Sequence, residues 1–293
     1  MSSPCEDATT DEPSYENGSW SMGDDGFDLG VRMNGKRFRI AVWADYFKDS
    51  PSATAAFQKA LAIMNDGDDS CEELWDYLEW IVDFFLPQFQ SLAPPVVHAG
   101  ILTLAHLAVR ESFECEFHVI QEKPVPGLVT RLVEEDFEEF DARTLQTSFP
   151  IVGLADVEVP YDDPAGIFSI IPQRVLVHGQ FFFYKSSVST EATRNEIGKY
   201  DKIAASGPSS SELPTSRLYA IVVGSKGRLR GLIYHFIKSE ERLTWAVDER
   251  APLALREKWA AQIKDTVAKL HHLGVVWGDV KADNVSSTRT VMP

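Results

Sequence analysis

Three side chains of different chemistry lie in one six-residue segment near the end of this 293-residue sequence. The segment holds the carboxylate of Asp279, the amine of Lys281 and the amide of Asn284, at offsets of zero, two and five. A carboxylate can orient a hydroxyl group, an ammonium group cancels negative charge, and amide oxygens bind metal ions. Such a set suits chemistry on a negatively charged substrate, although a bare D-x-K-x-x-N pattern arises often by chance.

The residues before Asp279 give this pattern a structural setting. An apolar stripe predicts a long amphipathic helix over about 252–272, Gly274 predicts its end, and Val275–Trp277 predicts a short strand. The stripe consists of Trp259, Ile263, Val267 and Leu270. The three polar residues are therefore expected in a turn that follows a helix and a strand.

Strands dominate the predicted elements between Pro150 and this helix. His178-Gly179 predicts the turn of a hairpin, and the Gly/Pro/Ser-rich stretch 206–216 predicts a loop. The predicted strands are 154–159, 174–177, 180–185, 218–223 and 230–237, with a helix at about 191–203 between the third and the fourth. The order is three strands, a helix, two strands, a hinge, a long helix and the turn with Asp279.

With this order of elements, the segment Trp277–Asn284 resembles a protein-kinase catalytic loop, whose pattern is H-R-D-L-K-x-x-N. The local sequence LHHLGVVWGDVKADNV is similar to the catalytic loops of kinase-like proteins common in fungi. The resemblance implies an α+β fold in which 151–237 form a kinase-like small lobe and 238–293 form the start of the large lobe. It also implies ATP-dependent phosphotransfer to Ser or Thr, with Asp279 orienting the hydroxyl group, Lys281 near the transferred phosphate and Asn284 holding Mg²⁺.

The same resemblance implies an ATP site on the predicted small lobe. Lys185, which ends a run of aromatic residues, corresponds to the lysine that binds the α- and β-phosphates. Glu196 is the predicted ion-pair partner of this lysine, and Glu191 is the alternative. Tyr234-His235-Phe236 would line the hinge, where adenine hydrogen-bonds to backbone groups.

Several features depart from the kinase pattern. No G-x-G-x-x-G precedes the second predicted strand, and the corresponding loop, Tyr161–Gly166, has one glycine and two carboxylates that would repel phosphate. Gly278 replaces the arginine before the catalytic aspartate, and Trp277 replaces the histidine. Only nine residues follow Asn284, so the D-F-G metal ligand and most of a large lobe are missing. We therefore expect a truncated or altered gene product that binds Mg-ATP weakly and is inactive as this chain.

Two other functions are compatible with these residues. Gly278-Asp279 also fits the H-G-D-x-x-x-x-N pattern of small-molecule kinases of the aminoglycoside or choline kinase type, although Lys281 favours the protein-kinase pattern. A pseudokinase that serves as an interaction module would need no nucleotide at all. The predicted helix at 252–272 would lack later helices to pack on, which predicts a protein partner or self-association through exposed apolar surface.

The N-terminal part is predicted to be a separate α+β region of unknown role over 27–150, after a disordered acidic tail at 1–26. Alternating apolar residues around Asn34-Gly35 predict a hairpin, and Ser50-Pro51 predicts the N-cap and first residue of a helix that ends near residue 66. The next predictions are a helix from an N-cap at Ser70 to Pro87, a buried helix at 96–109, a strand at 113–119 and a break at 124–127.

Composition excludes some partners and compartments. Residues 1–160 carry 30 acidic and 10 basic residues, so their charge would repel nucleic acid, whereas residues 161–293 carry 14 acidic and 18 basic residues. Three widely spaced cysteines predict neither zinc nor disulfides. The acidic N-terminus resembles no signal peptide, and no apolar run is long enough to span a bilayer. These features predict an intracellular protein, cytoplasmic or nuclear, that does not bind membranes.

Overall fold

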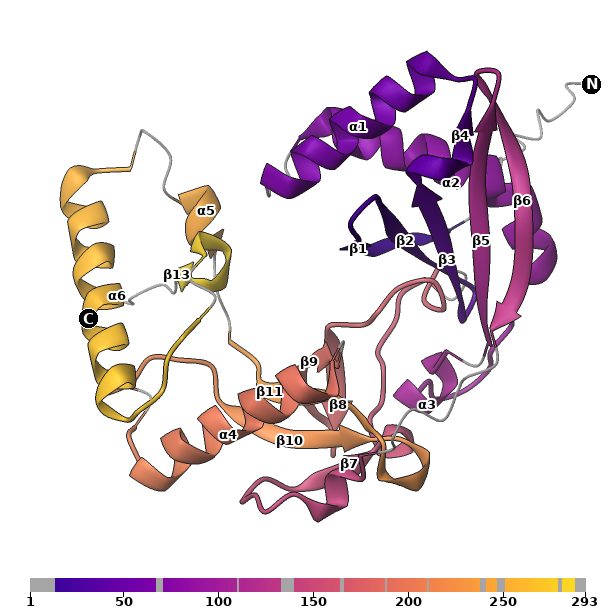
Figure 1. Cartoon of the computed structure of the whole chain (residues 1–293). Coiled ribbons are helices and arrows are strands. Elements are labelled where there is room, and N and C mark those ends of the chain that lie inside the picture. The colour runs from indigo at the N-terminus through magenta and orange to yellow at the C-terminus, as the bar shows by residue number, and fades with distance from the viewer. Residues whose placement is uncertain are drawn as a thin grey trace, which may run out of the picture. The chain divides into compact units, whose positions relative to one another are not determined.

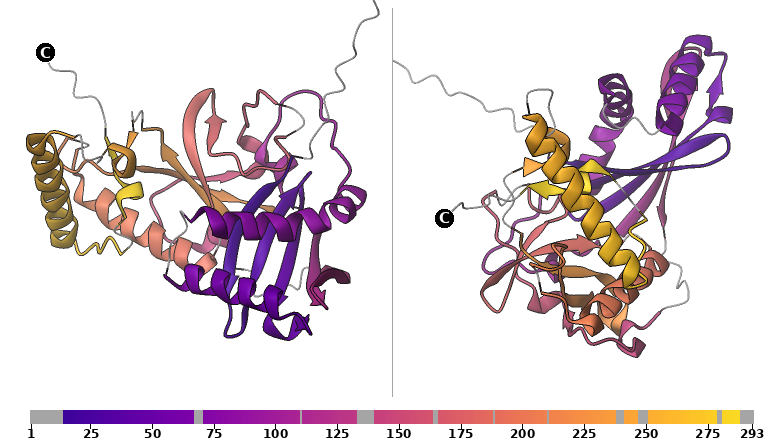
Figure 2. Two further views of the ribbon diagram at one scale, coloured as in Figure 1. Left: turned by 90° about the horizontal axis from the view of Figure 1, so that it is seen from above. Right: turned by 90° about the vertical axis from the view of Figure 1, so that its left-hand side faces the viewer.

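The computed structural model divides the chain into two compact units (Figures 1 and 2). Unit 1 comprises Met1–Leu102, His106–Phe137 and Tyr161–Pro172, and unit 2 comprises Thr103–Ala105, Glu138–Pro160 and Gln173–Pro293. The structure describes residues 14–66, 71–109, 111–132, 140–163, 166–187, 189–209, 211–237, 241–246, 251–278 and 281–287. Both units combine helices with a β-sheet, which confirms the predicted α+β class. The two units are interleaved along the chain, and the domain boundary predicted near Pro150 stays a prediction.

Unit 1 is built on a six-stranded sheet in the order β1-β2-β3-β5-β4, with β6 also paired to β5. β3 and β4 run parallel to β5, and the other pairs are antiparallel. The strands are β1 (Glu16–Met22), β2 (Gly26–Met33), β3 (Lys36–Trp43), β4 (Phe47–Lys48), β5 (Glu111–Ile120) and β6 (Lys123–Leu132).

The predicted hairpin of β2 and β3 is confirmed. Asn34 and Gly35 have φ angles of 48° and 79°, and a type I′ turn requires positive φ at both positions. The predicted disordered tail was wrong for its later part, because Glu16–Met22 pair with β2. Tyr15 and Trp20 pack against the core of unit 1, so this stretch has apolar area to bury despite its acidic composition.

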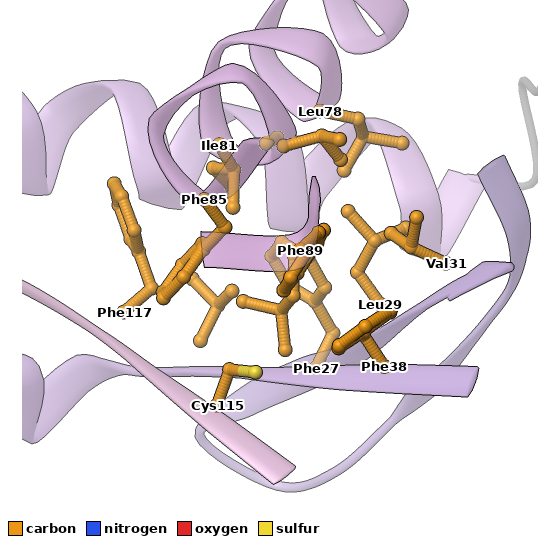
Figure 3. Packing of buried hydrophobic residues seen from close by; sticks show 14 of the residues in the cluster. Phe27, Leu29, Val31, Phe38, Leu78, Ile81, Phe85, Phe89, Cys115 and Phe117 are labelled. Carbon is orange, nitrogen blue, oxygen red and sulfur yellow. The ribbon is translucent and has the colours of Figure 1, made fainter. Parts of the chain in front are cut away.

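Two helices, α1 (Pro51–Asp66) and α2 (Glu72–Leu92), pack on one face of this sheet (Figure 3). The sheet supplies alternate residues of β2, β3 and β5, among them Phe27, Leu29, Phe38, Cys115 and Phe117, all fully buried. Complete burial of one such side chain contributes roughly 1.5–3 kcal/mol. Burial also raises the pKa of the Cys115 thiol to about 12, so this cysteine is an inert part of the core.

Helix α2 passes through Pro87 and ends at Leu92, so the predicted end at Pro87 was wrong. Phe85 and Phe89 lie one turn apart on either side of Pro87, and both are fully buried. Phe89 also stacks on Phe38, with ring centroids 3.9 Å apart. This packing offsets the backbone hydrogen bond that a proline inside a helix removes. Ser70, the predicted N-cap, lies outside the described residues.

Two further predictions in unit 1 were wrong for local reasons. Within 96–109 only α3 (Leu104–Leu107) is helical, and Val97 is 96% exposed. The φ of 100° at Gly100 is incompatible with a continuous right-handed helix there. The break predicted at 124–127 lies inside β6, whose only partner among the described strands is β5. An edge strand tolerates proline because one row of its N–H groups needs no partner.

Unit 2 contains a five-stranded sheet in the order β7-β10-β11-β9-β8, in which β7 runs parallel to β10. The remaining strand pairs are antiparallel. The elements are β7 (Ile151–Gly153), β8 (Arg174–Val177), β9 (Gln180–Ser186), α4 (Thr190–Ser206), β10 (Leu218–Val223) and β11 (Leu229–His235), followed by β12 (Glu241–Arg242), α5 (Leu243–Ala246), α6 (Leu253–His272) and β13 (Ser286–Ser287). Short 3-10 turns occupy Ala44–Tyr46, Ala142–Thr144, Leu154–Asp156, Ser225–Gly227 and Ala282–Asn284.

Most predicted elements of unit 2 are present. The β8–β9 hairpin turns at His178 and Gly179, with φ angles of 50° and 75°. The predicted strand at 154–159 was wrong, because the Asp156 carboxylate accepts a hydrogen bond from the Gly153 N–H at 3.1 Å and closes a turn. The predicted strand Val275–Trp277 is also absent, since these residues have no ladder pairing.

The N-terminus of α1 is capped from a distant part of the chain. The Glu122 carboxylate accepts hydrogen bonds from the N–H groups of Ser52 and Ala53, at 2.8 and 3.0 Å. Ser50, the predicted N-cap, instead donates from its hydroxyl group to the Lys48 carbonyl at 2.8 Å and accepts from the Glu122 N–H at 2.9 Å. The backbone hydrogen bonds from Ser52 and Ala53 lower the pKa of Glu122.

We expect Glu122→Gln to lower the free energy of unfolding at neutral pH. The folded pKa of Glu122 lies below its unfolded value of about 4.3, so its contribution is complete above that value and is lost as the pH falls through the folded pKa. The difference between the variant and the wild type should therefore shrink on acidification. Urea unfolding between pH 7 and pH 3 measures this difference in the free energy of unfolding. Glu79→Gln, on the exposed face of α2, serves as the control.

Candidate functional site

Lys185 points from β9 toward helix α4. In the pairing of β9 with β11, Lys185 lies opposite Leu232 and Phe183 lies opposite Tyr234, so these four side chains share one face of the sheet. The buried side of α4 packs on this face, where Ile197 joins Leu232 and Tyr234 in one apolar cluster. The register of β9 therefore places the Lys185 amine beside α4.

Helix α4 has well-defined ends. The Ser189 hydroxyl accepts a hydrogen bond from the Ala192 N–H at 3.3 Å, and Gly207, with a φ of 63°, follows the last turn. The hydroxyl groups of Thr193 and Ser187 bond at 2.8 Å and join the first turn of α4 to the residue after β9. These contacts fix the rotation of α4 and hence which of its glutamates faces β9.

Glu196 is the glutamate that meets Lys185. The Lys185 amine donates to both carboxylate oxygens of Glu196, at 3.0 and 2.8 Å. Glu191, the alternative partner, lies in the first turn of α4, where it lines a surface hollow together with Arg194. The predicted contact between Lys185 and Glu196 is therefore present, while its role in ATP binding stays a prediction.

The ion pair is open to solvent on the side of the lysine. The side chain of Lys185 is 54% exposed and that of Glu196 is 27% exposed. An ion pair with this exposure contributes at most about 1 kcal/mol to stability. The fold of unit 2 does not depend on it, and the amine of Lys185 is accessible to a charged ligand.

Tyr234 completes the cluster, in a role that the sequence did not predict. Its hydroxyl group donates to Oε1 of Glu196 at 2.6 Å, and the residue is 4% exposed. Burial is the main cause that raises the pKa of Tyr234, and the neighbouring Tyr200 and Glu196 add to it, so the hydroxyl stays a donor at neutral pH. The contact depends on the register between β9 and β11 and on the rotation of α4, and neither is visible in the sequence.

Two of the three residues predicted for the hinge lie in strand β11. Tyr234 and His235 are the last residues of β11, and the His235 N–H donates to the Arg217 carbonyl at 2.9 Å. Both residues are paired in the strand, and the prediction that they line an adenine-binding hinge stays a prediction. Phe236, the third of these residues, follows the last residue of β11 and is 50% exposed.

Asp279 lies outside the described residues, so the position of its carboxylate stays a prediction. Lys281 and Asn284 are described, and both are exposed. Asn284 ends the 3-10 turn Ala282–Asn284, and the Val285 carbonyl next to it accepts from the Leu243 N–H at 2.7 Å. The structure thus brings Lys185, Glu196 and Tyr234 together, whereas Lys281 and Asn284 lie in a segment held against α5.

Two lysines of α4, which the sequence did not single out, bind the backbone that leads to Asp279. The Lys199 amine donates to the Trp277 carbonyl at 3.4 Å, and the Lys202 amine donates to the Gly274 carbonyl at 3.1 Å. An apolar cluster behind them consists of Ile203, Leu213, Leu270 and Val275. Helix α4 therefore contacts both the Lys185 amine and the segment before the predicted catalytic turn.

The predicted phosphate loop belongs to the other unit. Tyr161–Pro172 is part of unit 1, and in it the Gly166 N–H donates to the Asp163 carboxylate at 2.9 Å. The comparison of Tyr161–Gly166 with the phosphate-binding loop of kinases stays a prediction. Two hollows of the described surface are lined by the segment 145–148 and by α4 residues such as Asp201, and Lys185 lines neither of these two.

The apolar stripe of α6 is mostly half-buried. Leu270 is buried, while Trp259, Ile263 and Val267 are partly covered. The more exposed apolar side chains lie nearby, with Leu253 64% and Val276 65% exposed. The predicted partner or self-association at this helix stays a prediction.

Comparisons with models of protein families, with curated proteins and with solved structures found no match. Among the described residues, no helix has the length and apolar character needed to cross a membrane. In the same part of the chain, no group of three or more His, Cys, Asp or Glu side chains is placed to hold a metal ion.

We expect Lys202→Met to loosen the segment before Asp279. The substitution removes the charged donor to the Gly274 carbonyl, so the amides of 275–278 should exchange with solvent several-fold faster. Hydrogen exchange read by mass spectrometry measures this rate in the full chain. Lys264→Met, which removes the same charge from the exposed side of α6, should leave these amides unchanged; equal effects of both variants would contradict the role of Lys202.

Proposed function

We propose that unit 2 is a protein-kinase-like domain that binds a nucleoside triphosphate through Lys185. The observation that carries the proposal is the ion pair between Lys185 on β9 and Glu196 on α4. In protein kinases a strand lysine is held by a glutamate of the following helix in order to bind the α- and β-phosphates. The spacing of Asp279, Lys281 and Asn284 supports the same family independently, since it is a feature of the sequence alone.

The residues present fit a phosphate group at Lys185. The Lys185 amine is exposed, and its partner Glu196 has a second donor, Tyr234. The ion pair therefore orients the amine while leaving it open to solvent. An ammonium group held in this way supplies the fixed positive charge that a polyphosphate requires. ATP would bring the transferable phosphoryl group, and Mg²⁺ would neutralise the charge that develops on it.

Asn284, with its exposed amide, and Asp279 are the proposed residues for the metal and for the attacking hydroxyl group. Lys281 is proposed to lie near the transferred phosphate. Phosphotransfer to Ser or Thr is the activity that this set of residues supports best. A small-molecule kinase would use the same aspartate and asparagine, and only Lys281 favours a protein substrate.

A pseudokinase that acts as an interaction module is the second candidate. One observation favours it: the loop Tyr161–Gly166 is grouped with unit 1 and not with the unit that carries Lys185. Glycine-rich backbone that would enclose the phosphates is therefore not contributed by this loop. Weak nucleotide binding, or none, is the property that distinguishes this candidate.

Binding of Mg-ATP to the full chain tests the proposal. We expect Lys185→Met to weaken binding at least about tenfold, because a hydrogen bond to a charged group contributes roughly 1.5–3 kcal/mol. Its free energy of unfolding should change by less than about 1 kcal/mol, since the ion pair is exposed. Titration calorimetry measures the affinity, and Lys264→Met serves as the charge-matched control. Affinity that is the same in Lys185→Met and the wild type would refute the assignment of the site.

A further inference from the structure

The carboxylate of Glu196 has two donors, and they approach from different elements. Lys185 on β9 bonds both oxygens, whereas Tyr234 on β11 bonds Oε1 only. The tyrosine bond is the shortest of the three, at 2.6 Å, and its donor is almost fully buried. The lysine is the most exposed member of the cluster, at 54%. The buried hydroxyl group therefore determines where the carboxylate lies, and the lysine follows the carboxylate.

The position of the Tyr234 hydroxyl group is itself fixed by packing. Its ring meets the ring of Tyr200 edge-on, with centroids 5.4 Å apart, and lies 6.3 Å from the ring of Phe183. Tyr200 follows Glu196 by one helical turn, so Tyr234 contacts two successive turns of α4. The Tyr200 hydroxyl group is bonded in turn to that of Ser216. A rigid aromatic layer between α4 and β11 thus holds the phenol that faces Glu196.

We infer that Tyr234 is a positioning residue of the candidate nucleotide site, which holds Glu196 in place so that Lys185 is directed at the phosphates of a bound nucleotide. The inference rests on the proposed function for its nucleotide part. When a phosphate attracts the Lys185 amine, the lysine loses part of its contact with Glu196. The hydrogen bond from Tyr234 to Oε1 remains, and this bond keeps the carboxylate from rotating toward solvent.

A buried tyrosine whose hydroxyl group merely needs a partner would have the same geometry. The chain offers a matched control for that case. Tyr184 is also buried, on the same sheet, and its hydroxyl group donates to the Arg230 carbonyl at 2.9 Å. It neighbours Lys185 in β9 and so lies on the opposite face of the sheet. Tyr184→Phe therefore removes one buried phenolic hydrogen bond without touching the ion pair.

The first measurement is the affinity of the full chain for Mg-ATP in Tyr234→Phe, which keeps the ring and removes the hydroxyl group. We expect the affinity to fall about tenfold, with the Tyr184→Phe control unchanged. If the wild type binds Mg-ATP and Tyr234→Phe binds it equally well, the inference is overturned. An equal loss in both variants would show that general loosening of the sheet is the cause, and this too would overturn it.

The second measurement needs no nucleotide. A double-mutant cycle of Tyr234→Phe with Glu196→Met, which removes the acceptor, is followed by urea unfolding and reports whether the two side chains stabilise each other. We expect the double variant to lose less stability than the two single losses together, and Tyr184→Phe with Glu196→Met to be additive. Additivity of Tyr234→Phe with Glu196→Met overturns the inference. Coupling in a chain that fails to bind Mg-ATP supports the positioning of Glu196 by Tyr234 and refutes the proposed function separately.

Discussion

Unit 2 depends on the orientation of α4 against its sheet. The helix has to bury Ile197 and Ile203 while it keeps Glu196 at the end of β9, where Lys185 lies. Ser189 and Thr193 fix its start, and the Tyr234 hydroxyl group bonds the carboxylate of Glu196. The exposed ion pair adds little stability. Its position is therefore a consequence of the apolar packing of α4 and not a cause of it.

The same helix connects two parts of the candidate site. Its middle carries Glu196, and its last turns carry Lys199 and Lys202, which bind the carbonyls before Asp279. A shift of α4 would move the ion pair and the backbone of the predicted catalytic turn together. A ligand that binds Lys185 and shifts α4 would therefore also move the backbone of this turn, because both are attached to the same helix.

Local signals in the sequence predicted much of the fold. Asn34-Gly35 and His178-Gly179 form the predicted hairpin turns because two adjacent residues that tolerate positive φ suffice to close such a turn. The wrong predictions involve partners far apart in the chain. Pro87 lies within α2 because Phe89 reaches the core, and the prolines of β6 are accommodated by an edge position that only the whole sheet defines.

The candidate site also has parts that the sequence predicts and a part that depends on tertiary packing. The types and spacing of Lys185, Glu196 and Asp279 are visible in the sequence, and the contact between the first two follows once a strand and a helix are placed in order. Tyr234 was predicted in a hinge because its sequence position is the end of a strand. Its contact with Glu196 depends on strand register and on the rotation of α4, and both are set by packing across tens of residues.

The most direct test of the account asks whether the phosphates of a nucleotide meet Lys185. An acyl phosphate of ATP transfers its acyl group to a lysine amine near the phosphates, with release of ATP, and peptide mass spectrometry identifies the modified residue. The account predicts acylation of Lys185 that an excess of Mg-ATP prevents. Acylation confined to other lysines, or acylation of Lys185 that Mg-ATP does not reduce, would contradict it.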